Sequence, residues 1–416
     1  MKTVKFLFIF LLVGILTHSC IKKEDPVYGP VISGDIQMGA LLSLTGAGSS
    51  TGLGSQAALE LARQDILAYF NMLRINKQVK IEIADTKTDT AEALKQLKIM
   101  YNKGLRLIIG PYTSAELSAL KNFADTHDML IVSPSSVAVS LAIPNDNVFR
   151  FVSNDVIQGA AMKTMLVEDS VKVIVPLVRD DLWGRDLLTS TRSGFESVGG
   201  KVCTPLFYPP DVTDFNGFLE QLNEHVGEEL GSYSPDEIAV YLLSLGEGTN
   251  FLAKSHAFGN LDDVAWYGSS AFAQNALVLA DTTAASFARG HGLPCPVYGL
   301  DEAAKDKWQP LVSRVQGLTG RAPDVYAITA YDACWVAALT WLRTGPAPSV
   351  AFLKSVFTSE AGNFFGASGN TALDVNGDRA AGNYDFWAVK DHNEGYAWEV
   401  VATYNSVTGK LTRVAK

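Results

Sequence analysis

Two loops rich in hydroxyl side chains follow neighbouring apolar segments that are typical of strands. Residues 110–116 (Gly-Pro-Tyr-Thr-Ser-Ala-Glu) open a predicted helix in which Thr113 and Glu116 have the spacing of a capping box. The free N–H groups and the dipole of a helix N-terminus favour an anion, and Ser114 adds a hydroxyl beside them. Residues 133–137 (Ser-Pro-Ser-Ser-Val) leave the next segment in the same manner. The two loops could bind a carboxylate together, although each loop alone is more typical of a cap or a turn.

Residues 48–52 (Gly-Ser-Ser-Thr-Gly) match the G-x-S-x-G pattern, which presents a nucleophilic serine between a strand and a helix. A serine hydrolase also needs a histidine late in the chain. The later histidines are His127, His225, His256, His291 and His392. His225 lies in a helix-like stretch and His392 in a charged segment, and the loop of residues 44–54 is predicted to be too long for a tight strand-to-helix turn. We therefore expect neither an enzyme nor a catalytic residue.

Two other ligand classes have weak support. Residues 52–57 (Gly-Leu-Gly-Ser-Gln-Ala) imitate the dinucleotide fingerprint G-x-G-x-x-A, but the first glycine comes too late after the strand and Asp85 is too distant. No histidine, cysteine or carboxylate group has metal-ligand spacing. The sequence predicts no cofactor and no metal.

Aromatic side chains gather near predicted strand ends in the second half of the chain, and they are Trp183, Tyr241, Trp266, Tyr267 and Phe272. Such residues could form the wall of a ligand site, but they are more often part of a core. Asp180 and Asp181, which precede Trp183, are interpreted as loop caps or as polar anchors for a ligand.

Strand-like and helix-like segments alternate from Ile36 onward. Strands are predicted at residues 36–43, 80–85, 105–109, 129–132 and 148–152. Helices are predicted at residues 53–73, after the capping residue Asp89, and at residues 117–124. Repeated β-α units of this kind indicate a parallel sheet with helices on both faces.

The same alternation starts again after a break near residues 153–155. Strands are predicted at residues 171–178, 202–207, 237–243 and 264–268, with helices at 184–198, 215–222 and 248–257 between them. After a second break near residues 290–298 come helices at 306–318, 326–342 and 350–357, and two antiparallel strands at 385–389 and 398–403. Two runs predict two sheets. Because open parallel sheets bind ligands beyond the carboxyl ends of their strands, two facing sheets would place a site between them.

The composition limits the classes of protein. The chain has 416 residues, a net charge of −10 and 47% hydrophobic residues, which suffices for a sizeable core in two domains. It has no basic cluster beyond its N-terminal segment, which argues against nucleic acid as a partner.

The N-terminus is typical of an export signal. Lys2 and Lys5 precede an apolar run over residues 6–16, which is too short to span a bilayer of about 30 Å. Ser19 and Cys20 then resemble the end of a bacterial lipoprotein signal, although Thr17 stands where leucine is usual. We expect a signal over residues 1–20, lipidation of Cys20 and a tether over 21–35; the alternative is an ordinary cleaved signal. No later stretch is predicted to be transmembrane.

The cysteines that follow are Cys203, Cys295 and Cys334. An oxidising compartment would permit a Cys203–Cys295 disulfide, but the spacing cannot show that the two are close. We expect instead that all three are small buried apolar residues.

From Ile36 to about Lys416, the chain resembles the type I periplasmic binding proteins, and in particular their branched-chain amino-acid binding branch. The marks of this resemblance are Leu-Thr-Gly at 44–46 followed by Gly52, the loops at 110–114 and 133–134, Val-Phe-Arg at 148–150, Trp-Gly at 183–184, Thr-Asp-Phe at 213–215, Ala-Tyr-Asp-Ala at 330–333, and the segments 366–369, 373–379 and Tyr384. Their order and spacing are specific even though no single mark is.

The resemblance implies an α/β fold of two Rossmann-like lobes with parallel sheets, joined by three hinge crossovers. Residues 36–153 with 296–380 would form the first lobe, and residues 154–295 with 381–416 the second. It also implies an extracytoplasmic substrate-binding lipoprotein, in the periplasm or on the outer surface, that delivers a small ligand to an ABC-type permease. A ligand-binding sensor without a transporter is the alternative, and a serine hydrolase is a weaker one.

Carried over by position, Ser114, Ser135 and Val137 would line the first-lobe wall that receives an α-carboxylate. Thr51 and Trp183 occupy places where the family often has tyrosines, and Val137 replaces a usual threonine. Ser270 stands where amino-acid binders present an acid to the α-ammonium, and an unpaired buried ammonium would be costly. The resemblance therefore implies that Glu247 or Asp181 substitutes for that acid, or that the ligand is a carboxylate other than an α-amino acid.

Overall fold

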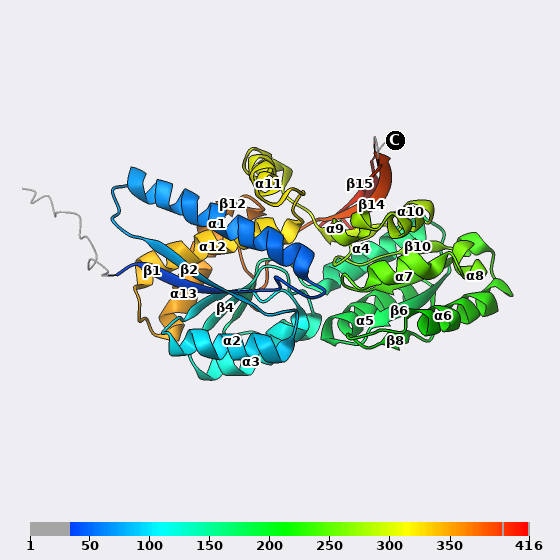
Figure 1. The fold of residues 1–416 in the computed structure, drawn as a ribbon, viewed down its shortest axis with the longest axis horizontal. Helices are drawn as coiled ribbons and strands as arrows, with labels where there is room; N and C mark the ends of the chain where they lie inside the picture. The colour runs from blue at the N-terminus through cyan, green and yellow to red at the C-terminus, as the bar shows by residue number, and fades with distance from the viewer. Residues whose placement is uncertain (1–33, 393–394, 415–416) are drawn as a thin grey trace, which may run out of the picture.

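The structure is a computed structural model that describes residues 34–392 and 395–414, and it has two α/β lobes side by side (Figure 1). The predicted signal, Cys20 and nearly all of the predicted tether lie outside the described residues. The first lobe contains a five-stranded sheet in the order β2-β1-β3-β4-β5, in which all pairs are parallel, as predicted. Its strands are β1 (Ile36–Leu42), β2 (Val79–Asp85), β3 (Leu107–Ile109), β4 (Leu130–Ser133) and β5 (Val148–Arg150).

Helices cover both faces of this sheet because its strands are apolar on both sides. Met38 and Leu42 of β1 pack in one core cluster with α1 (Ser49–Met72), α12 (Val325–Thr344) and α13 (Val350–Asn363). Leu41 packs on the opposite face with α2 (Thr90–Asn102) and α3 (Ser114–Thr126). The segment that contains α12 and α13 thus returns to complete the first lobe (Figure 1).

The second lobe contains a parallel sheet in the order β10-β9-β6-β7, with β8 also paired to β6. Its strands are β6 (Val173–Arg179), β7 (Lys201–Val202), β8 (Leu206–Tyr208), β9 (Ile238–Leu243) and β10 (Ala265–Tyr267). The longer helices of its core are α4 (Asp155–Glu168), α5 (Leu182–Glu196), α6 (Phe215–Leu230), α7 (Gly248–Ser255) and α10 (Thr282–Gly290). The single strand predicted at 202–207 is wrong, because Pro205 has no N–H group to continue the ladder and divides it into β7 and β8.

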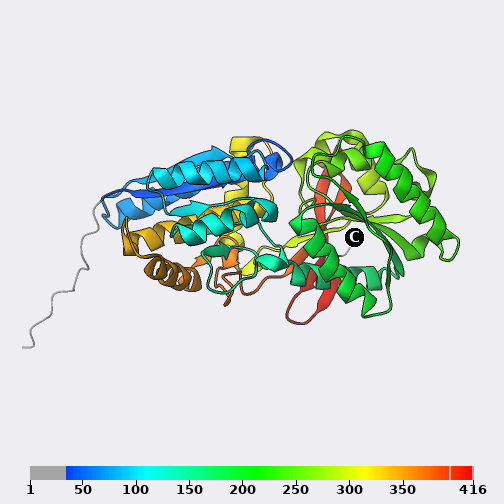
Figure 2. The same cartoon turned by 90° about the horizontal axis from the view of Figure 1, so that it is seen from below.

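A third, antiparallel sheet joins segments distant in sequence, in the order β11-β14-β15-β16. Its strands are β11 (Cys295–Tyr298), β14 (Tyr384–His392), β15 (Gly395–Asn405) and β16 (Lys410–Arg413). The remaining elements are α8 (Gly259–Asp262), α9 (Ala276–Ala280), α11 (Lys305–Thr319), the pair β12 (Phe365–Gly366) and β13 (Gly369–Asn370), and the short helices η1 (Val139–Leu141), η2 (Pro235–Glu237) and η3 (Glu302–Ala304). The chain passes between the lobes after β5, after β11 and before β14, and Figure 2 shows the same two lobes from below.

Helix α12 is apolar enough to be mistaken for a membrane span. It has 20 residues, its mean hydropathy reaches 1.3, and among the described helices it alone is long and apolar enough to cross a bilayer. However, 78% of this stretch is buried, and Ala333, Ala337 and Trp341 pack in the first-lobe core. The helix is all-round hydrophobic because the sheet and its neighbouring helices enclose it.

The three cysteines of the described residues are free thiols, so Cys203 and Cys295 do not form a disulfide here. Cys295 and Cys334 are buried in the second and first lobe cores. Cys203 is half-buried beside Glu229, at 3.4 Å between Sγ and Oε1, and burial raises the pKa of its thiol to about 12. The prediction of buried apolar cysteines is thus right for two of the three.

The carboxyl group of Asp385 on β14 is a source of pH-dependent stability. Burial, with a smaller contribution from Glu302, raises the pKa of Asp385 from 3.8 to about 6. The folded state therefore holds this proton more tightly, so its stabilising effect is present below pH 3.8 and is lost as the pH rises through about 6. We expect Asp385→Asn to raise the free energy of unfolding by about 2 kcal/mol at neutral pH. Urea denaturation across this pH range, in which the variant shows a flatter pH profile, measures the effect.

Candidate functional site

A small cavity, with a volume of about 20 Å³ for the centres of water-sized molecules, lies between the two lobes. From the first lobe it is lined by Tyr112, Thr113, Ser114, Ser135, Val137 and Tyr326. From the second lobe it is lined by Asp181, Trp183, Leu245, Ser270 and Ala271. Except for Tyr326, these residues follow the carboxyl ends of β3, β4, β6, β9 and β10, where two facing parallel sheets are expected to hold a ligand.

The structure brings six of the eight predicted site residues to this interlobe cavity: Ser114, Ser135, Val137, Asp181, Trp183 and Ser270. Thr51 and Glu247 do not line it. The Thr51 hydroxyl donates to Asp324 and lies beside the hydroxyl of Tyr112, so Thr51 stands behind a tyrosine that does line the cavity. Glu247 forms an ion pair with Arg179 instead.

Helix α3 presents its N-terminus to the cavity. The capping box predicted for Thr113 and Glu116 is confirmed: Thr113 Oγ1 accepts from the Glu116 N–H at 3.1 Å, and Glu116 Oε2 accepts from the Thr113 N–H at 3.0 Å. The cap orders the first turn, in which Ser114 is 2% exposed. The positive end of the helix dipole thus points at a dry part of the cavity wall, where it favours an anionic group.

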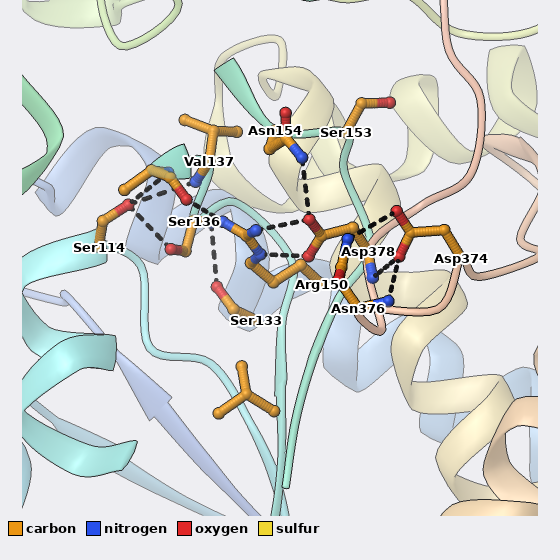
Figure 3. Close-up of polar contacts among 12 residues, drawn as sticks. Ser114, Ser133, Ser136, Val137, Arg150, Ser153, Asn154, Asp374, Asn376 and Asp378 are labelled. Carbon is orange, nitrogen blue, oxygen red and sulfur yellow. Dashed lines mark hydrogen bonds and ion pairs between the residues drawn. The ribbon is translucent and has the colours of Figure 1, made fainter. Parts of the chain in front are cut away.

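Hydrogen bonds between hydroxyls and backbone groups hold the two serine loops together (Figure 3). Ser114 Oγ accepts from the N–H groups of Val137 and Ala138, at 3.3 and 3.2 Å, and lies 2.8 Å from Ser136 Oγ. Ser135 Oγ donates to the Tyr112 carbonyl at 2.8 Å. Ser114 Oγ already accepts from these two N–H groups, so the donors that this wall can offer to a carboxylate are the serine hydroxyls and the first-turn N–H groups of α3.

Two tyrosines in the cavity wall were missed by the sequence analysis. Tyr112 and Tyr326 meet edge to face with ring centroids 6.1 Å apart, and burial raises the pKa of both hydroxyls. Tyr112 stands inside the serine loop that the sequence analysis singled out, so its position was available. Tyr326 lies in the first turn of α12, after the capping residue Asp324, and no local pattern marked it.

On the second lobe, one guanidinium binds two carboxylates. Arg179 Nε donates to Asp181 Oδ2 and Arg179 Nη1 to Glu247 Oε1, each at 2.7 Å. Asp181 also caps α5, because its Oδ1 accepts from the Gly184 N–H at 2.9 Å. Asp181 is therefore both a loop cap and a polar cavity residue, and its charge is shared with Arg179.

The other second-lobe residues of the cavity carry no charge. Trp183, in the first turn of α5, is 5% exposed, and Ser270 lies beside the Tyr326 hydroxyl across the lobe boundary. The remaining aromatic residues that the sequence placed near strand ends are core residues that do not line the cavity: Tyr241, Trp266, Tyr267 and Phe272. Of the two interpretations, a core role is therefore right for these four.

Around the cavity the lobes are already in contact. The Ser140 N–H donates to Asp186 Oδ2 at 2.8 Å, and the Val325 N–H donates to Gln274 Oε1 at 3.0 Å. Gly246 approaches the opposite lobe so closely that a Cβ atom there would lie 2.6 Å from the Ala47 carbonyl oxygen. The described conformation is thus one in which the two lobes are closed on each other.

A buried ion pair ties the hinge segments together. Arg150 Nε and Nη2 donate to the two carboxylate oxygens of Asp378 at 2.5 and 2.6 Å, and Asn154 adds a bond at 3.1 Å (Figure 3). Both ends of the pair are at most 1% exposed. Asp374 orders the loop that presents Asp378 by accepting from its N–H at 3.0 Å. This ion pair joins two residues that are 228 positions apart in the sequence, at the point where the chain passes from the first lobe to the second.

The G-x-S-x-G pattern of residues 48–52, after β1, is explained by helix packing. The loop predicted over residues 44–54 is wrong in length, because α1 begins at Ser49 and already includes Ser50 and Gly52. Ser50 Oγ accepts from the Ala276 N–H at 3.4 Å. A Cβ at Gly52 would lie 2.0 Å from the Ser43 carbonyl oxygen, so this glycine permits close packing of the helix on the strand.

A search of the described residues for groups of three or more metal-ligating side chains finds none. The cavity wall instead combines hydroxyls, backbone N–H groups, aromatic rings and one carboxylate. Such a wall can bind and orient a small polar molecule.

Comparisons with known proteins agree with this fold. A family model described as periplasmic binding protein matches residues 35–393. An uncharacterised protein of Methanocaldococcus jannaschii is 24% identical over 426 residues, which cover 96% of this chain and 97% of that protein. A leucine-binding protein of Thermotoga maritima superposes with a TM-score of 0.73 at 19% identity, over 89% of this chain and 99% of that one. A solute-binding protein of R. palustris in complex with benzoate has a TM-score of 0.71 at 17% identity, over 88% and 96% of the two chains.

Proposed function

Because this chain belongs to the periplasmic binding protein family, we propose that it captures a small carboxylate ligand between its lobes and delivers it to an ABC-type permease. The observation that carries this proposal is the interlobe cavity, in which the N-terminus of α3 and the Ser114 hydroxyl face residues of the opposite lobe. The protein would have no catalytic step to perform. It would bind the ligand, close its lobes around it and release it to the permease.

The chemistry of the first-lobe wall supports a carboxylate. The lining residues include no lysine or arginine, so neutral donors would bind the anion. Those donors are the helix N-terminus and Ser114, and hydrogen bonds from such groups to a charged partner contribute about 1.5–3 kcal/mol each. The α-carboxylate of an amino acid and the carboxylate of an aromatic acid would both fit this half of the site.

Ligand capture would work by a shift between open and closed states. A ligand that contacts both walls gains its full set of interactions only when the lobes are closed, so binding favours closure. We propose that the hinge divides the chain into residues 36–153 with 296–380 and residues 154–295 with 381–416. The buried Arg150–Asp378 pair would keep the hinge segments in register while the lobes move.

The cellular place of the protein is also part of the proposal. An export signal over residues 1–20 and a lipid on Cys20 would hold the binding lobes at the outer face of a membrane, through a tether at 21–35. Labelling of cells with a radioactive fatty acid would test this, because Cys20→Ser should release an unlabelled protein.

The ligand proposal is tested by a screen followed by one substitution. We expect thermal-shift and calorimetric titration with amino acids, aliphatic acids and benzoate to find a ligand, and Ser114→Ala to weaken its binding at least about 5-fold. Ser313→Ala, which removes an exposed hydroxyl on α11, serves as the control. If Ser114→Ala left the affinity unchanged, or if no carboxylate bound the wild-type chain, the assigned site would be wrong.

A further inference from the structure

A second and larger cavity crosses the lobe boundary, with a volume of about 420 Å³ for the centres of water-sized molecules. One wall is formed by η3, α11 and the start of α12, and the other by α9, β14 and β15. Figure 1 shows α11 and the strands β14 and β15 at the same edge of the molecule, on opposite sides of the lobe boundary. Tyr298 and Asp385 also line it, beside two of the segments that pass between the lobes, so we call it the hinge cavity. Its volume falls within the range of about 300–1,000 Å³ that is usual for small-molecule sites.

The sheet wall of the hinge cavity is aromatic. Asp385 and Trp387 are two positions apart on β14 and both line the cavity, whereas Phe386 between them packs in the second-lobe core. The β15 side chains of this wall include Tyr396, Trp398 and Val400. An antiparallel sheet with one buried face usually presents polar side chains on the other face. Here that face carries three half-buried aromatic rings, which indicates a surface that can receive an apolar group.

The rings of the sheet wall are available to a cation. On the α11 wall, Lys305 Nζ lies 5.6 Å from the ring centroid of Trp308. In the part of the chain that the structure describes, no lysine or arginine lies over the rings of Trp387, Tyr396 or Trp398. A cation is attracted to the face of an aromatic ring, and tryptophan attracts it most strongly. A positively charged ligand could therefore use these three rings.

The charge of the hinge cavity also favours a cation. Its charged lining residues are the acids Glu302, Asp324 and Asp385 and a single base, Arg321. The charge of Arg321 acts on Asp324, and Glu302 accepts from Lys305 Nζ at 3.0 Å. Within residues 34–392 and 395–414, no hydrogen bond or ion pair reaches the carboxylate of Asp385. Charged groups that a protein shields from water are normally paired, so Asp385 has the capacity to bind a cation from outside the chain.

We propose that the hinge cavity is a second binding site, and that its ligand is a protonated amine with an apolar body. The ammonium group would donate hydrogen bonds to Asp385, and the apolar body would pack against Trp387 and Trp398. The site is separate from the interlobe cavity, because the two cavities share no lining residue. The inference is therefore independent of the ligand proposed for the interlobe cavity.

The cost of Asp385 to the empty protein supports this assignment. Burial raises the pKa of Asp385 to about 6, and Glu302 contributes a smaller part of the shift, so the ionised acid destabilises the fold at neutral pH. Acids that are held at the expense of stability are typical of functional sites. An ammonium group at hydrogen-bond distance would favour the ionised form. The affinity for an amine should therefore rise as the pH increases through about 6.

The experiment compares two compounds with the same apolar body. Phenethylamine carries an ammonium group at neutral pH, and 2-phenylethanol carries a neutral hydroxyl in its place. Both would be titrated by calorimetry into the wild-type chain, Asp385→Asn and Trp387→Leu. We expect the wild-type chain to prefer phenethylamine by about 10-fold or more, and Asp385→Asn to reduce this preference below about 3-fold. Trp387→Leu should weaken the binding of both compounds by about 3-fold or more.

The control is a carboxylate on the same strand that does not line the hinge cavity. Asp391 forms an exposed ion pair with Arg289, and Asp391→Asn should keep the preference for phenethylamine. Asp385→Asn is expected to be more stable than the wild-type chain, so unfolding would not explain a lost preference. The inference would be overturned if the wild-type chain bound phenethylamine no better than 2-phenylethanol, if Asp385→Asn kept the preference, or if Trp387→Leu changed neither affinity. In each of these cases the proposed function of the interlobe cavity would stand.

Discussion

Asp378→Asn is expected to lower the free energy of unfolding by about 3–5 kcal/mol. The substitution leaves the Arg150 guanidinium charged and buried, with at most one of its two bonds of 2.5 and 2.6 Å, because the amide nitrogen of asparagine cannot accept a hydrogen bond. It also removes the partner of Asn154 at the start of α4. Because the pair joins the strand that leaves the first lobe to a loop that returns to it, the loss affects the hinge and both lobes. Chemical denaturation followed by tryptophan fluorescence measures the change.

The matched control is an arginine–aspartate pair on the surface. Arg289 donates two hydrogen bonds to Asp391, at 2.9 and 2.6 Å, but the side chains are 52% and 65% exposed. Water can replace the lost partner there, so we expect Asp391→Asn to leave the stability unchanged. Equal effects of the two substitutions would show that the buried hinge pair has no special role.

Gly246→Val is expected to weaken ligand binding about 100-fold without unfolding the chain. A Cβ at Gly246 would lie 2.6 Å from the Ala47 carbonyl oxygen across the lobe boundary, and 2.8 Å from Cδ1 of Leu277. Overpacking of this severity costs about 3 kcal/mol. The clash with Ala47 exists only in the closed state, whereas Leu277 belongs to the same lobe as Gly246 and its flexible side-chain end must shift in either state. A ligand that binds the closed state must then supply this free energy, which lowers its apparent affinity by the same factor.

Calorimetric titration gives the affinity, and small-angle X-ray scattering gives the accompanying change in shape. The variant with ligand should remain more extended than the wild-type chain with ligand. Gly317→Val is the control, since a Cβ at Gly317 on α11 meets nothing within 4 Å. An unchanged affinity for Gly246→Val would mean that tight contact between Gly246 and the first lobe is not required for binding.

Much of the fold follows from patterns that lie within short windows of sequence. Buried strands such as residues 36–42 are continuous apolar runs, and the helices beside them repeat apolar residues every three or four positions. The capping signals of Asp89 and Thr113 placed two helix starts correctly. Two local predictions were wrong: the strand at 202–207, which Pro205 interrupts, and the loop at 44–54, where glycines lie inside a helix.

The sequence predicted only those residues of the candidate site that lie close together along the chain. The serine loops could be found because they follow adjacent parallel strands, whose carboxyl ends meet at one edge. Tyr326 could not, because it reaches the cavity from a helix more than 180 residues beyond those loops. The Arg150–Asp378 pair depends on long-range packing, which no spacing in the sequence encodes.

The protonated, sheltered state of the cysteines has a practical consequence. Cys295 and Cys334 are enclosed, and the thiol of Cys203, with its pKa near 12, holds almost no thiolate at neutral pH. Maleimide reagents react with the thiolate form of cysteine, so we expect the three cysteines of the described residues to react with them only slowly. A single cysteine introduced at the rim of the cleft could then carry an environment-sensitive dye, and the protein would become an optical reporter of its own ligand.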